Sequence, residues 1–482
     1  MVLSVKPPLL ATLAKRWASV AFALSLGGCQ VAAQLPPVAG GPSSPRAYSV
    51  IVQLFEWGWS DIAQECEAWL GPNGYGAVQI SPPHEHQNLS RDGSFAWKQR
   101  YEPISYRLTS RSGNRDALAD MVNRCHRAGV KVYVDMALTA GSSAEAPLAD
   151  DATASTAHNV EGTGGEKEQT AIAAAMNELL ALGVAGFRLA GADRIPPEHI
   201  AKILQRLHPL NPKFHVNGGQ PFIYQAITQP TTVDAKTSDY FGNGAVTELR
   251  YGRNLGEQIR HGQLKNLVLF GEAWGLIPSH KAVVFTDNHI TQRSRDRNIV
   301  TFEAPADNGA SYRLANVFML AWPYGTPKVM SSYDWSQDPG RAGPPTDDQG
   351  NSQAVSCGDG WVCEHRWPAI TNMVQFRNVT QGATTVDHWW DNGDSQIAFS
   401  RGDRGFVAIN HESQPLSTPL MTGLPPGQYC NILAMDTADA SVSEDSPSVS
   451  LCPEVIEVRA DGTAAIEVAP QQAMAIHIGA RP

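Results

Sequence analysis

Short apolar segments alternate with amphipathic helical segments along most of this chain, beginning near residue 49. Strand candidates follow one another at residues 49–55, 77–80, 130–138, 186–189, 222–227, 245–249, 282–285 and 327–331. Strands that alternate with helices are typical of βα units in a parallel sheet. These units predict an α/β fold, a (β/α)8 TIM barrel over residues 48–385, with its functional site at the carboxyl ends of the strands.

The C-terminal part of the chain has a different sequence pattern. Turn-forming sequences recur after about residue 386, namely DNG at 391–393, RGDRG at 401–405 and PPG at 425–427, with short alternating runs between them. This spacing is typical of antiparallel β-structure. We therefore expect a C-terminal antiparallel β-sandwich domain over residues 386–482. A chain of 482 residues with 42% hydrophobic composition is long enough to bury the cores of both domains.

The N-terminus resembles a bacterial lipoprotein signal. Basic residues within positions 1–16 precede an apolar stretch at 17–26, and the sequence LGGC ends at Cys29. This pattern predicts a signal peptide over residues 1–28, lipidation of Cys29, and an exported protein tethered to the membrane on its periplasmic or cell-surface side. The alternative is an ordinary secretory signal in which Cys29 is incidental. Residues 29–47, rich in Pro, Gly, Ser and Ala, predict a flexible linker.

The charge of the chain bears on its partners. Lys+Arg number 37 against 47 for Asp+Glu, which gives a formal net charge of -10. Since no excess of positive charge is available to neutralise a phosphate backbone, we do not expect nucleic acid as a partner. The sequence also lacks a run of about 20 apolar residues that would cross a bilayer.

Cysteines other than Cys29 number six of the 7 in the chain, an even number that favours disulfides in an exported protein. Number alone leaves the pairing open. Position in the expected fold favours three pairs, Cys66 with Cys125, Cys357 with Cys363, and Cys430 with Cys452. The first pair would join neighbouring outer helices, the second would close a short loop, and the third would lie within the C-terminal domain.

Several longer motifs are specific enough to indicate a family. They are IVQLFEW at 51–57, LGP at 70–72, GYG at 74–76, QRY at 99–101, RSGN at 111–114, DYFGNG at 239–244 and WVCEHRW at 361–367. From about residue 48 to its end, the chain resembles the animal-type, chloride-dependent branch of the α-amylases, a glycoside hydrolase family of carbohydrate metabolism. The resemblance implies the same barrel and the same disulfide pairs. It also implies a lobe inserted after the third strand, which is shortened here to residues 139–165.

Three expected strand ends match the family's catalytic segments but lack its acids. They read GFRLA at 186–190, FIYQA at 222–226 and FTDNHI at 285–290. The resemblance places Ala190 at the nucleophilic Asp, Ala226 at the general-acid Glu, and Ile290 at the Asp that stabilises the transition state. Retaining glycoside hydrolysis requires two carboxyl groups. We therefore expect a pseudoenzyme without hydrolytic activity that binds an α-glucan or a protein partner.

Relocated carboxylates are the alternative interpretation. Glu272, within GEAW at 271–274, resembles the general acid of other amylase branches, Asp193 follows Ala190 by three residues, and Asp287 lies near the end of the seventh strand. Such acids would give an active α-1,4-glucan hydrolase or transferase. We favour loss of catalysis because a retaining pair must lie about 5–5.5 Å apart, and because the animal-type register places the acid position at Ala226.

The family's calcium site is not retained in the sequence. The resemblance implies an Asn ligand after the third strand and a His ligand after the fourth, where this chain has Thr139 and Arg194. A guanidinium disfavours a bound cation, and calcium prefers several oxygen ligands. We predict no calcium.

Chloride is possible. The resemblance places Arg188, Asn288 and Arg366 at the positions that hold chloride in this branch, and two guanidinium groups near one point need an anion or a carboxylate. The alternative is that Arg188 pairs with Asp135 and Arg366 with Glu364 as core ion pairs.

Candidates for contact with a glycan are Trp97, Tyr101 and His289. Part of the sugar-binding apparatus implied by the resemblance is replaced, since Ala140 stands at a sugar-facing His and Lys98 at one of a pair of stacking Trp residues.

A metal-dependent hydrolase is a second chemistry to weigh. His84-Glu85-His86, which follows the second strand, has the spacing of a metal-ligand pair. The motif holds no third ligand, so we favour the interpretation that these are polar loop residues.

Overall fold

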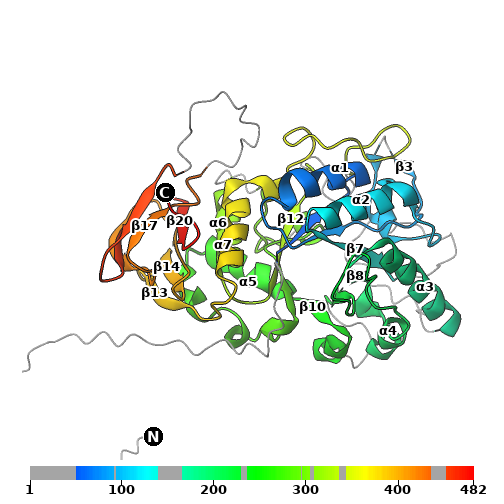
Figure 1. The fold of residues 1–482 in the computed structure, drawn as a ribbon, viewed down its shortest axis with the longest axis horizontal. Coiled ribbons are helices and arrows are strands. Elements are labelled where there is room, and N and C mark those ends of the chain that lie inside the picture. Colours follow the sequence, from blue (N-terminus) through cyan, green and yellow to red (C-terminus); the bar gives the residue numbers. More distant parts are fainter. Residues whose placement is uncertain are drawn as a thin grey trace, which may run out of the picture. The chain divides into compact units, whose positions relative to one another are not determined.

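The parallel strands of the first domain close into a barrel in the order β1, β12, β11, β10, β9, β8, β7, β2. Figure 1 labels four of them, β7, β8, β10 and β12. The computed structural model describes residues 50–91, 94–138, 165–228, 236–294, 296–303, 309–335, 343–435 and 452–482. The barrel strands are β1 (Ile51–Leu54), β2 (Ala77–Ile80), β7 (Lys131–Ala137), β8 (Gly186–Ala190), β9 (Phe222–Gln225), β10 (Ala245–Thr247), β11 (Ala282–Val284) and β12 (Thr326–Ser331). Every strand candidate of the sequence is confirmed, with ends that differ by a few residues.

The strands form where short apolar runs can be buried on both faces. β1 reads IVQL and β2 reads AVQI, and both are buried at every position, as expected for parallel strands covered by helices outside and filled by side chains inside. The polar residues within these runs belong to the interior. Gln53 pairs with Gln79 in the β1–β2 register, and Asp135 pairs with Arg188 in the β7–β8 register, so polar groups meet inside the barrel.

Helices follow the strands and cover the barrel. The longer helices are α1 (Trp59–Glu65), α2 (Arg115–Arg127), α3 (Glu166–Leu182), α4 (Pro197–Leu204), α5 (Leu249–Arg260), α6 (Ala310–Ala321) and α7 (Pro368–Val379). Local sequence sets their ends. Asn114 caps α2 by accepting a hydrogen bond from the Ala117 amide, and Gly183 ends α3 with φ of 107°, a left-handed conformation that suits glycine.

Short elements occupy the connections. The short helices are η1 (Cys66–Leu70), η2 (Trp97–Tyr101), η3 (Ala192–Arg194), η4 (Thr237–Asn243), η5 (Leu264–Leu269), η6 (Glu272–Trp274), η7 (Ser279–Lys281), η8 (Thr291–Arg293) and η9 (Glu364–Arg366). Two small hairpins, β3 (Ser90–Arg91) with β4 (Ser94–Phe95) and β5 (Thr109–Ser110) with β6 (Gly113–Asn114), lie between β2 and α2.

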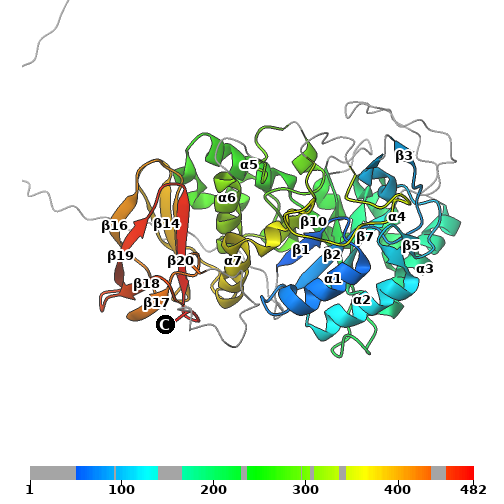
Figure 2. The same cartoon turned by 90° about the horizontal axis from the view of Figure 1, so that it is seen from above.

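The C-terminal domain is antiparallel β-structure, as predicted (Figure 2). Its strands are β13 (Asp387–Asp391), β14 (Gln396–Arg401), β15 (Gly405–Asn410), β16 (Leu416–Met421), β17 (Gly427–Cys430), β18 (Val455–Val458), β19 (Thr463–Val468) and β20 (Gln472–His477). β13, β14, β15 and β20 form one sheet, and β16 pairs with β19. Phe406 and Ile476 of the sheet share one apolar core with Leu416 and Ile466 of the pair.

The predicted disulfides are confirmed. Cys66 is bonded to Cys125, Cys357 to Cys363, and Cys430 to Cys452. The first bond ties η1 to α2, the second closes a loop before η9, and the third lies within the C-terminal domain.

Some predictions fall outside the described residues. These are the signal peptide over 1–28, Cys29, the linker over 29–47, Thr139, Ala140, and all but the last residue of the shortened lobe at 139–165. Where the chain is described, none of its helices combines the length and the hydropathy of a membrane span.

Candidate functional site

Aliphatic side chains stand at three carboxyl ends of the barrel strands. Ala190 is the last residue of β8, and Ala226 directly follows β9 and donates its backbone N–H to Leu189 O at 3.0 Å. These two methyl groups therefore belong to adjacent strands, and each residue is 9% exposed. Ile290 lies just before η8, with its N–H donated to Asn288 Oδ1 at 2.8 Å, and is 46% exposed.

A polar network centred on Asp135 fills the barrel below these ends. Arg188 Nη1 donates to Asp135 Oδ1 at 2.6 Å, and the Tyr101 hydroxyl donates to Asp135 Oδ2 at 2.8 Å. Gln79 Nε2 also donates to Oδ2 at 3.2 Å, and the Tyr224 hydroxyl donates to Gln79 Oε1 at 2.6 Å. The Arg188–Asp135 ion pair is the one that the alternative interpretation of the sequence proposed. Such a buried pair is satisfied only because several hydrogen bonds surround it.

His289 is held in one tautomer by a chain of hydrogen bonds. Lys328 Nζ donates to Gln53 Oε1 at 2.7 Å, which fixes the amide orientation because an ammonium group has only donors. Gln53 Nε2 then lies 3.0 Å from His289 Nδ1, so Nδ1 accepts and Nε2 carries the hydrogen. Burial holds the pKa of His289 well below its usual value, and the positive charges of Arg188, Lys328 and Arg293 lower it further. The imidazole is therefore neutral, and its buried Nε2–H has no acceptor among the described residues.

The glycan-contact candidates come together in one aromatic cluster. The His289 ring stacks on Phe55 at 4.9 Å and on Tyr101 at 5.3 Å between centroids. Trp97 meets His289 edge-on at 5.4 Å and Tyr101 at 5.7 Å. Trp97 is only 7% exposed and His289 only 1%, so these rings are largely covered by one another and by the surrounding residues.

Arg293 completes the cluster and was missed from the sequence. Its guanidinium carbon lies 4.5 Å from the ring of Trp335, 4.6 Å from Tyr333, 5.1 Å from Phe55 and 5.9 Å from Trp97. Nη1 donates to His289 O at 2.9 Å and Nη2 to Ser332 Oγ at 3.1 Å. Rings at these distances attract a cation. The available signal was its position three residues after Ile290.

The predicted chloride set is not brought together. Arg366 Nε donates to Glu65 Oε1 at 2.8 Å, and its guanidinium carbon lies 5.4 Å from the Trp69 ring. Asn288 Oδ1 accepts from the backbone N–H groups of Ile290 and Thr291. Arg366 turns outward to α1 because it lies in the short helix η9, after the barrel strand has ended.

The alternative pairing of Arg366 with Glu364 was also wrong. Glu364 is buried, accepts the Ser332 N–H at 2.7 Å, and has its pKa raised to about 8 by burial.

The cation found near Arg188 is Lys328. Burial lowers the pKa of Lys328 to about 7, and the positive charge of Arg188 contributes to this shift. The sequence signal for it was a lysine in the middle of a strand candidate, which forms β12.

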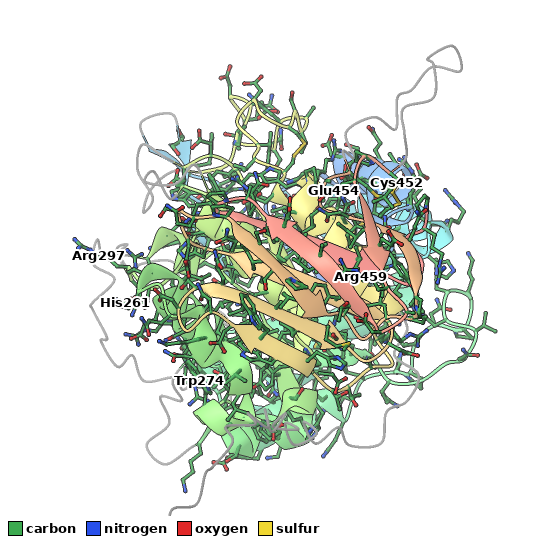
Figure 3. The ribbon with its side chains drawn as sticks, turned by 90° about the vertical axis from the view of Figure 1, so that its left-hand side faces the viewer. His261, Trp274, Arg297, Cys452, Glu454 and Arg459 are labelled. Atoms are coloured by element: carbon green, nitrogen blue, oxygen red, sulfur yellow. A yellow bond between two sulfur atoms is a disulfide. The ribbon has the colours of Figure 1, made fainter. Side chains whose placement is uncertain are left out.

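Two of the fallback carboxylates face away from the strand ends. Glu272 lies in η6, in the connection from α5 to β11, and its Oε1 accepts the Ser279 N–H at 2.8 Å. Ser279 in turn accepts the N–H of Gly325, which directly precedes β12. Glu272 therefore lies towards the amino ends of β11 and β12, so it is not a candidate acid here; its neighbour Trp274 is labelled in Figure 3.

Asp287 is directed towards α6. Its Oδ1 accepts the Tyr312 hydroxyl of α6 at 3.1 Å, and its Oδ2 accepts Gln292 Nε2 at 2.7 Å. Burial raises its pKa to about 6. Asp193 alone remains at the carboxyl ends: it lies in η3 just after β8, is 9% exposed, and accepts a hydrogen bond from the Thr228 hydroxyl.

The histidine motif does not assemble a metal site. His84 and His86 are buried, and burial lowers the pKa of each to about 4. Glu85 pairs instead with Arg107, at 2.6 Å. Over the described ranges, no group of three or more His, Cys, Asp or Glu residues is arranged to hold a metal ion. The residue at the expected calcium position, Arg194, is exposed and is not an oxygen ligand, so it does not fit that ion.

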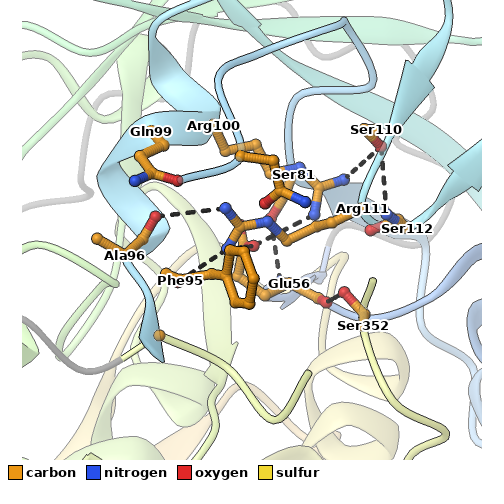
Figure 4. Close-up of polar contacts among 12 residues, drawn as sticks. Glu56, Ser81, Phe95, Ala96, Gln99, Arg100, Ser110, Arg111, Ser112 and Ser352 are labelled. Carbon is orange, nitrogen blue, oxygen red and sulfur yellow. Dashed lines mark hydrogen bonds and ion pairs between the residues drawn. The ribbon is translucent and has the colours of Figure 1, made fainter. Parts of the chain in front are cut away.

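A second buried ionic cluster supports the aromatic residues (Figure 4). Glu56, which follows β1 with φ of 69°, lies with its Oε2 3.3 Å from Arg100 Nη1 and 3.6 Å from Arg111 Nη1. Arg111 Nη1 also donates to Phe95 O at 3.1 Å, and Arg100 belongs to η2 itself. This cluster fixes the segment that carries Trp97 and Tyr101 against the end of β1.

Comparison with known proteins gives consistent matches over most of the chain. The family "Alpha amylase, C-terminal all-beta domain" matches residues 387–479. Pancreatic alpha-amylase 2a5 of Mus musculus is 39% identical over 461 residues, which cover 83% of this chain and 90% of that protein. Alpha-amylase 1B of Homo sapiens is 40% identical over 451 residues, covering 80% and 87%.

Solved structures agree. A glutamate-to-glutamine variant of alpha-amylase I from Eisenia fetida, solved as a maltohexaose complex, superposes with a TM-score of 0.79 and 34% sequence identity. The match covers 91% of this chain and 99% of that one.

These relatives overturn the predicted location. They are α-amylases of animals, including pancreatic ones, and not bacterial proteins tethered to a membrane. The prediction of a bacterial lipoprotein was therefore wrong. It rested on a short pattern of basic residues, apolar residues and one cysteine, and so loose a pattern recurs in unrelated leader sequences.

Proposed function

Because the chain belongs to the α-amylase family, we propose that it is a carbohydrate-binding member of that family that does not hydrolyse glucans. One observation carries the proposal. At the ends of the adjacent strands β8 and β9 the side chains are the methyl groups of Ala190 and Ala226, and Ile290 follows β11. None of these groups can attack a sugar or protonate a leaving oxygen.

The positions of the remaining acids support this proposal. A retaining mechanism needs two carboxyl groups about 5–5.5 Å apart across the sugar. Glu272 lies towards the other end of the barrel, and Asp287 is bonded to Tyr312 of α6. Asp193 would have to act alone, and loss of one member of a catalytic constellation costs about 10⁴ or more in rate.

Retained polar and aromatic groups support glycan binding. Beside the ring of Trp97, His289 offers a buried N–H that no described residue accepts. Sugar hydroxyls supply acceptors, and their apolar faces suit aromatic rings. The Eisenia fetida relative, a glutamate-to-glutamine variant, was solved in complex with maltohexaose, so a relative with one carboxylate replaced by an amide holds a glucan.

Chloride stays a prediction, with a changed set of residues. Arg188 and Lys328 are cations inside the barrel. Of these two, Arg188 is bonded to Asp135, whereas Lys328 donates to Gln53. A chloride ion beside them would balance the second positive charge. With Ala226 at the acid position, the ion would have a structural role.

Incubation of the purified protein with maltoheptaose, followed by product analysis, tests the central proposal. We expect no cleavage overnight, together with a binding heat in calorimetry. Sustained turnover that Asp193→Asn abolishes would establish a working enzyme with a relocated acid and overturn the proposal. A protein-binding scaffold would give neither cleavage nor heat with the sugar, and would overturn the glycan-binding part.

A further inference from the structure

We propose that the saccharide bound at this site carries a negative charge, as a carboxylate or a phosphate group. The inference rests on the proposed function and specifies its ligand. It follows from two independent features of the aromatic cluster around His289, namely its unpaired hydrogen-bond donors and its excess of cations.

The first feature is a set of donors without acceptors. Within the part of the chain that the structure describes, His289 Nε2, Trp97 Nε1 and Arg293 Nε are buried nitrogen atoms without a hydrogen-bond partner. Each carries a hydrogen, because the tautomer of His289 is fixed by Gln53 and the other two nitrogens are always protonated at neutral pH. An unpaired buried donor costs free energy. A ligand group that only accepts hydrogen bonds, such as a carboxylate or phosphate oxygen, satisfies such donors best.

The second feature is positive charge that the neighbouring side chains offset only in part. Arg188 is paired with Asp135 at 2.6 Å. The hydrogen bonds of the other two cations go to neutral groups: Arg293 donates to His289 O and Ser332 Oγ, and Lys328 donates to Gln53 Oε1. All three cations act on the His289 ring, so the ring lies in a field that favours an anion.

The neighbouring carboxylates offset this field only in part, since Asp135 and Asp287 both act on Lys328. Asp135 is already shared by Arg188, Tyr101 and Gln79, and Asp287 bonds to Tyr312 in α6. Burial raises the pKa of Glu303 by more than Arg293 lowers it, and a raised pKa favours the neutral carboxyl group. At the three strand ends, aliphatic groups stand where an acid would have balanced the charge.

The rim adds another cation. Lys98 is exposed, and its Nζ lies 6.0 Å from the centroid of the Trp97 ring. It can therefore reach a charged group on a ligand whose sugar ring contacts Trp97. Lys98 and Arg293 belong to η2 and η8, which follow different strands, so together they would hold an anion from two sides.

Calorimetry with matched ligands tests the inference. The ligands are maltoheptaose, maltoheptaose with C6 carboxylates, maltoheptaose with C6 phosphates, and inorganic phosphate alone, all in a chloride-free buffer of low ionic strength. We expect at least one charged heptasaccharide to bind about tenfold more tightly than the neutral one, because partly buried charge pairs contribute on this scale. The two charged forms distinguish a carboxylate ligand from a phosphate ligand.

Substitutions identify the residues responsible. Lys98→Gln should reduce the advantage of the charged ligand by about threefold, and Arg293→Gln should remove most of it. Lys98 is exposed, so its variant tests the idea even if Arg293→Gln does not fold. The matched control is Arg459→Gln, an exposed arginine of the C-terminal domain (Figure 3), which should leave both affinities unchanged.

The outcomes separate this inference from the proposed function. Equal or tighter binding of neutral maltoheptaose would overturn the charge inference and leave the glycan-binding proposal intact. If none of the heptasaccharides binds, the proposed function itself fails. If inorganic phosphate binds as tightly as the phosphorylated sugar, the site recognises an anion without a saccharide, which also overturns the inference.

Discussion

Gln53 Nε2 lies 3.0 Å from His289 Nδ1, and this contact joins the first strand of the barrel to the segment that follows β11. The same amide accepts a hydrogen bond from Lys328 Nζ in β12 through its oxygen. One neutral side chain therefore sets the tautomer of the imidazole and also gives a buried ammonium group an acceptor. Removal of the Gln53 side chain should therefore affect both His289 and Lys328.

We predict that Gln53→Ala lowers the free energy of unfolding by about 1–3 kcal/mol, because it leaves the Lys328 ammonium and the His289 ring without partners. The measurement is urea denaturation at pH 7. Gln428→Ala is the matched control, since Gln428 is exposed in β17, and it should stay within about 0.5 kcal/mol of the unchanged protein. Equal effects of the two substitutions would show that the contact contributes nothing.

A second prediction concerns pH. Burial raises the pKa of Glu364 from 4.5 to about 8. Between these two values the unfolded chain is ionised while the folded chain holds the proton, so this group makes stability fall as pH rises from about 5 to 8. Glu364→Gln should remove that dependence. The free energy of unfolding of Glu364→Gln minus that of the original protein should therefore be about 1–3 kcal/mol larger at pH 7.5 than at pH 5.

Chemical denaturation across that pH range provides the measurement. Glu454→Gln is a useful control, because Glu454 lies in the C-terminal domain (Figure 3), where it accepts a hydrogen bond from Asn431 Nδ2. A difference between Glu364→Gln and the original protein that stays constant with pH would contradict the prediction.

The fold was predictable from the sequence because strands and their spacing are local properties. Each barrel strand is a short apolar run between turn signals, and the disulfide pairs follow from the order of the elements. Glu272 shows the limit: the letters GEAW do not reveal which end of the barrel they occupy. Glu272 lies before β11 rather than after it, and only the chain path shows this.

The site depends on contacts between residues far apart in sequence, which single-sequence patterns do not contain. The sequence offers Arg366 as a neighbour of Arg188 in a chloride site, but Arg366 lies in η9 and bonds to Glu65. The cation near Arg188 is instead Lys328, a buried residue of β12. The role of Gln53 could not be predicted, because its partner His289 lies 236 positions along the chain.

A third prediction addresses chloride. If the ion balances the charge of Arg188 and Lys328, sodium chloride should raise the melting temperature more than sodium gluconate at equal ionic strength. Binding at about 100 times the dissociation constant is worth about 2.7 kcal/mol. Lys328→Gln should abolish the difference between the two salts, whereas Lys265→Gln, which changes a lysine bonded to Gly393 O in the C-terminal domain, should preserve it. Identical shifts with both salts would rule out a specific chloride site.

The last prediction restores the acids. The triple variant Ala190→Asp, Ala226→Glu, Ile290→Asp should cleave maltoheptaose slowly but measurably, because the strand ends that carry these positions are in place and Arg188, Tyr101 and His289 remain beside them. Each single variant should stay inactive, since members of a catalytic constellation act as a unit and their effects are not additive. The control is the isosteric triple variant with Asn, Gln and Asn, which has the same shape without the charges. Product analysis after overnight incubation measures the activity of all these variants.

If the acidic triple variant is as inactive as its amide control, the loss of carboxylates is not the whole reason for inactivity. The changed surroundings, Lys98 and Arg194 among them, must then also prevent hydrolysis. If the original protein cleaves as fast as the acidic variant, these three positions are not where its chemistry takes place.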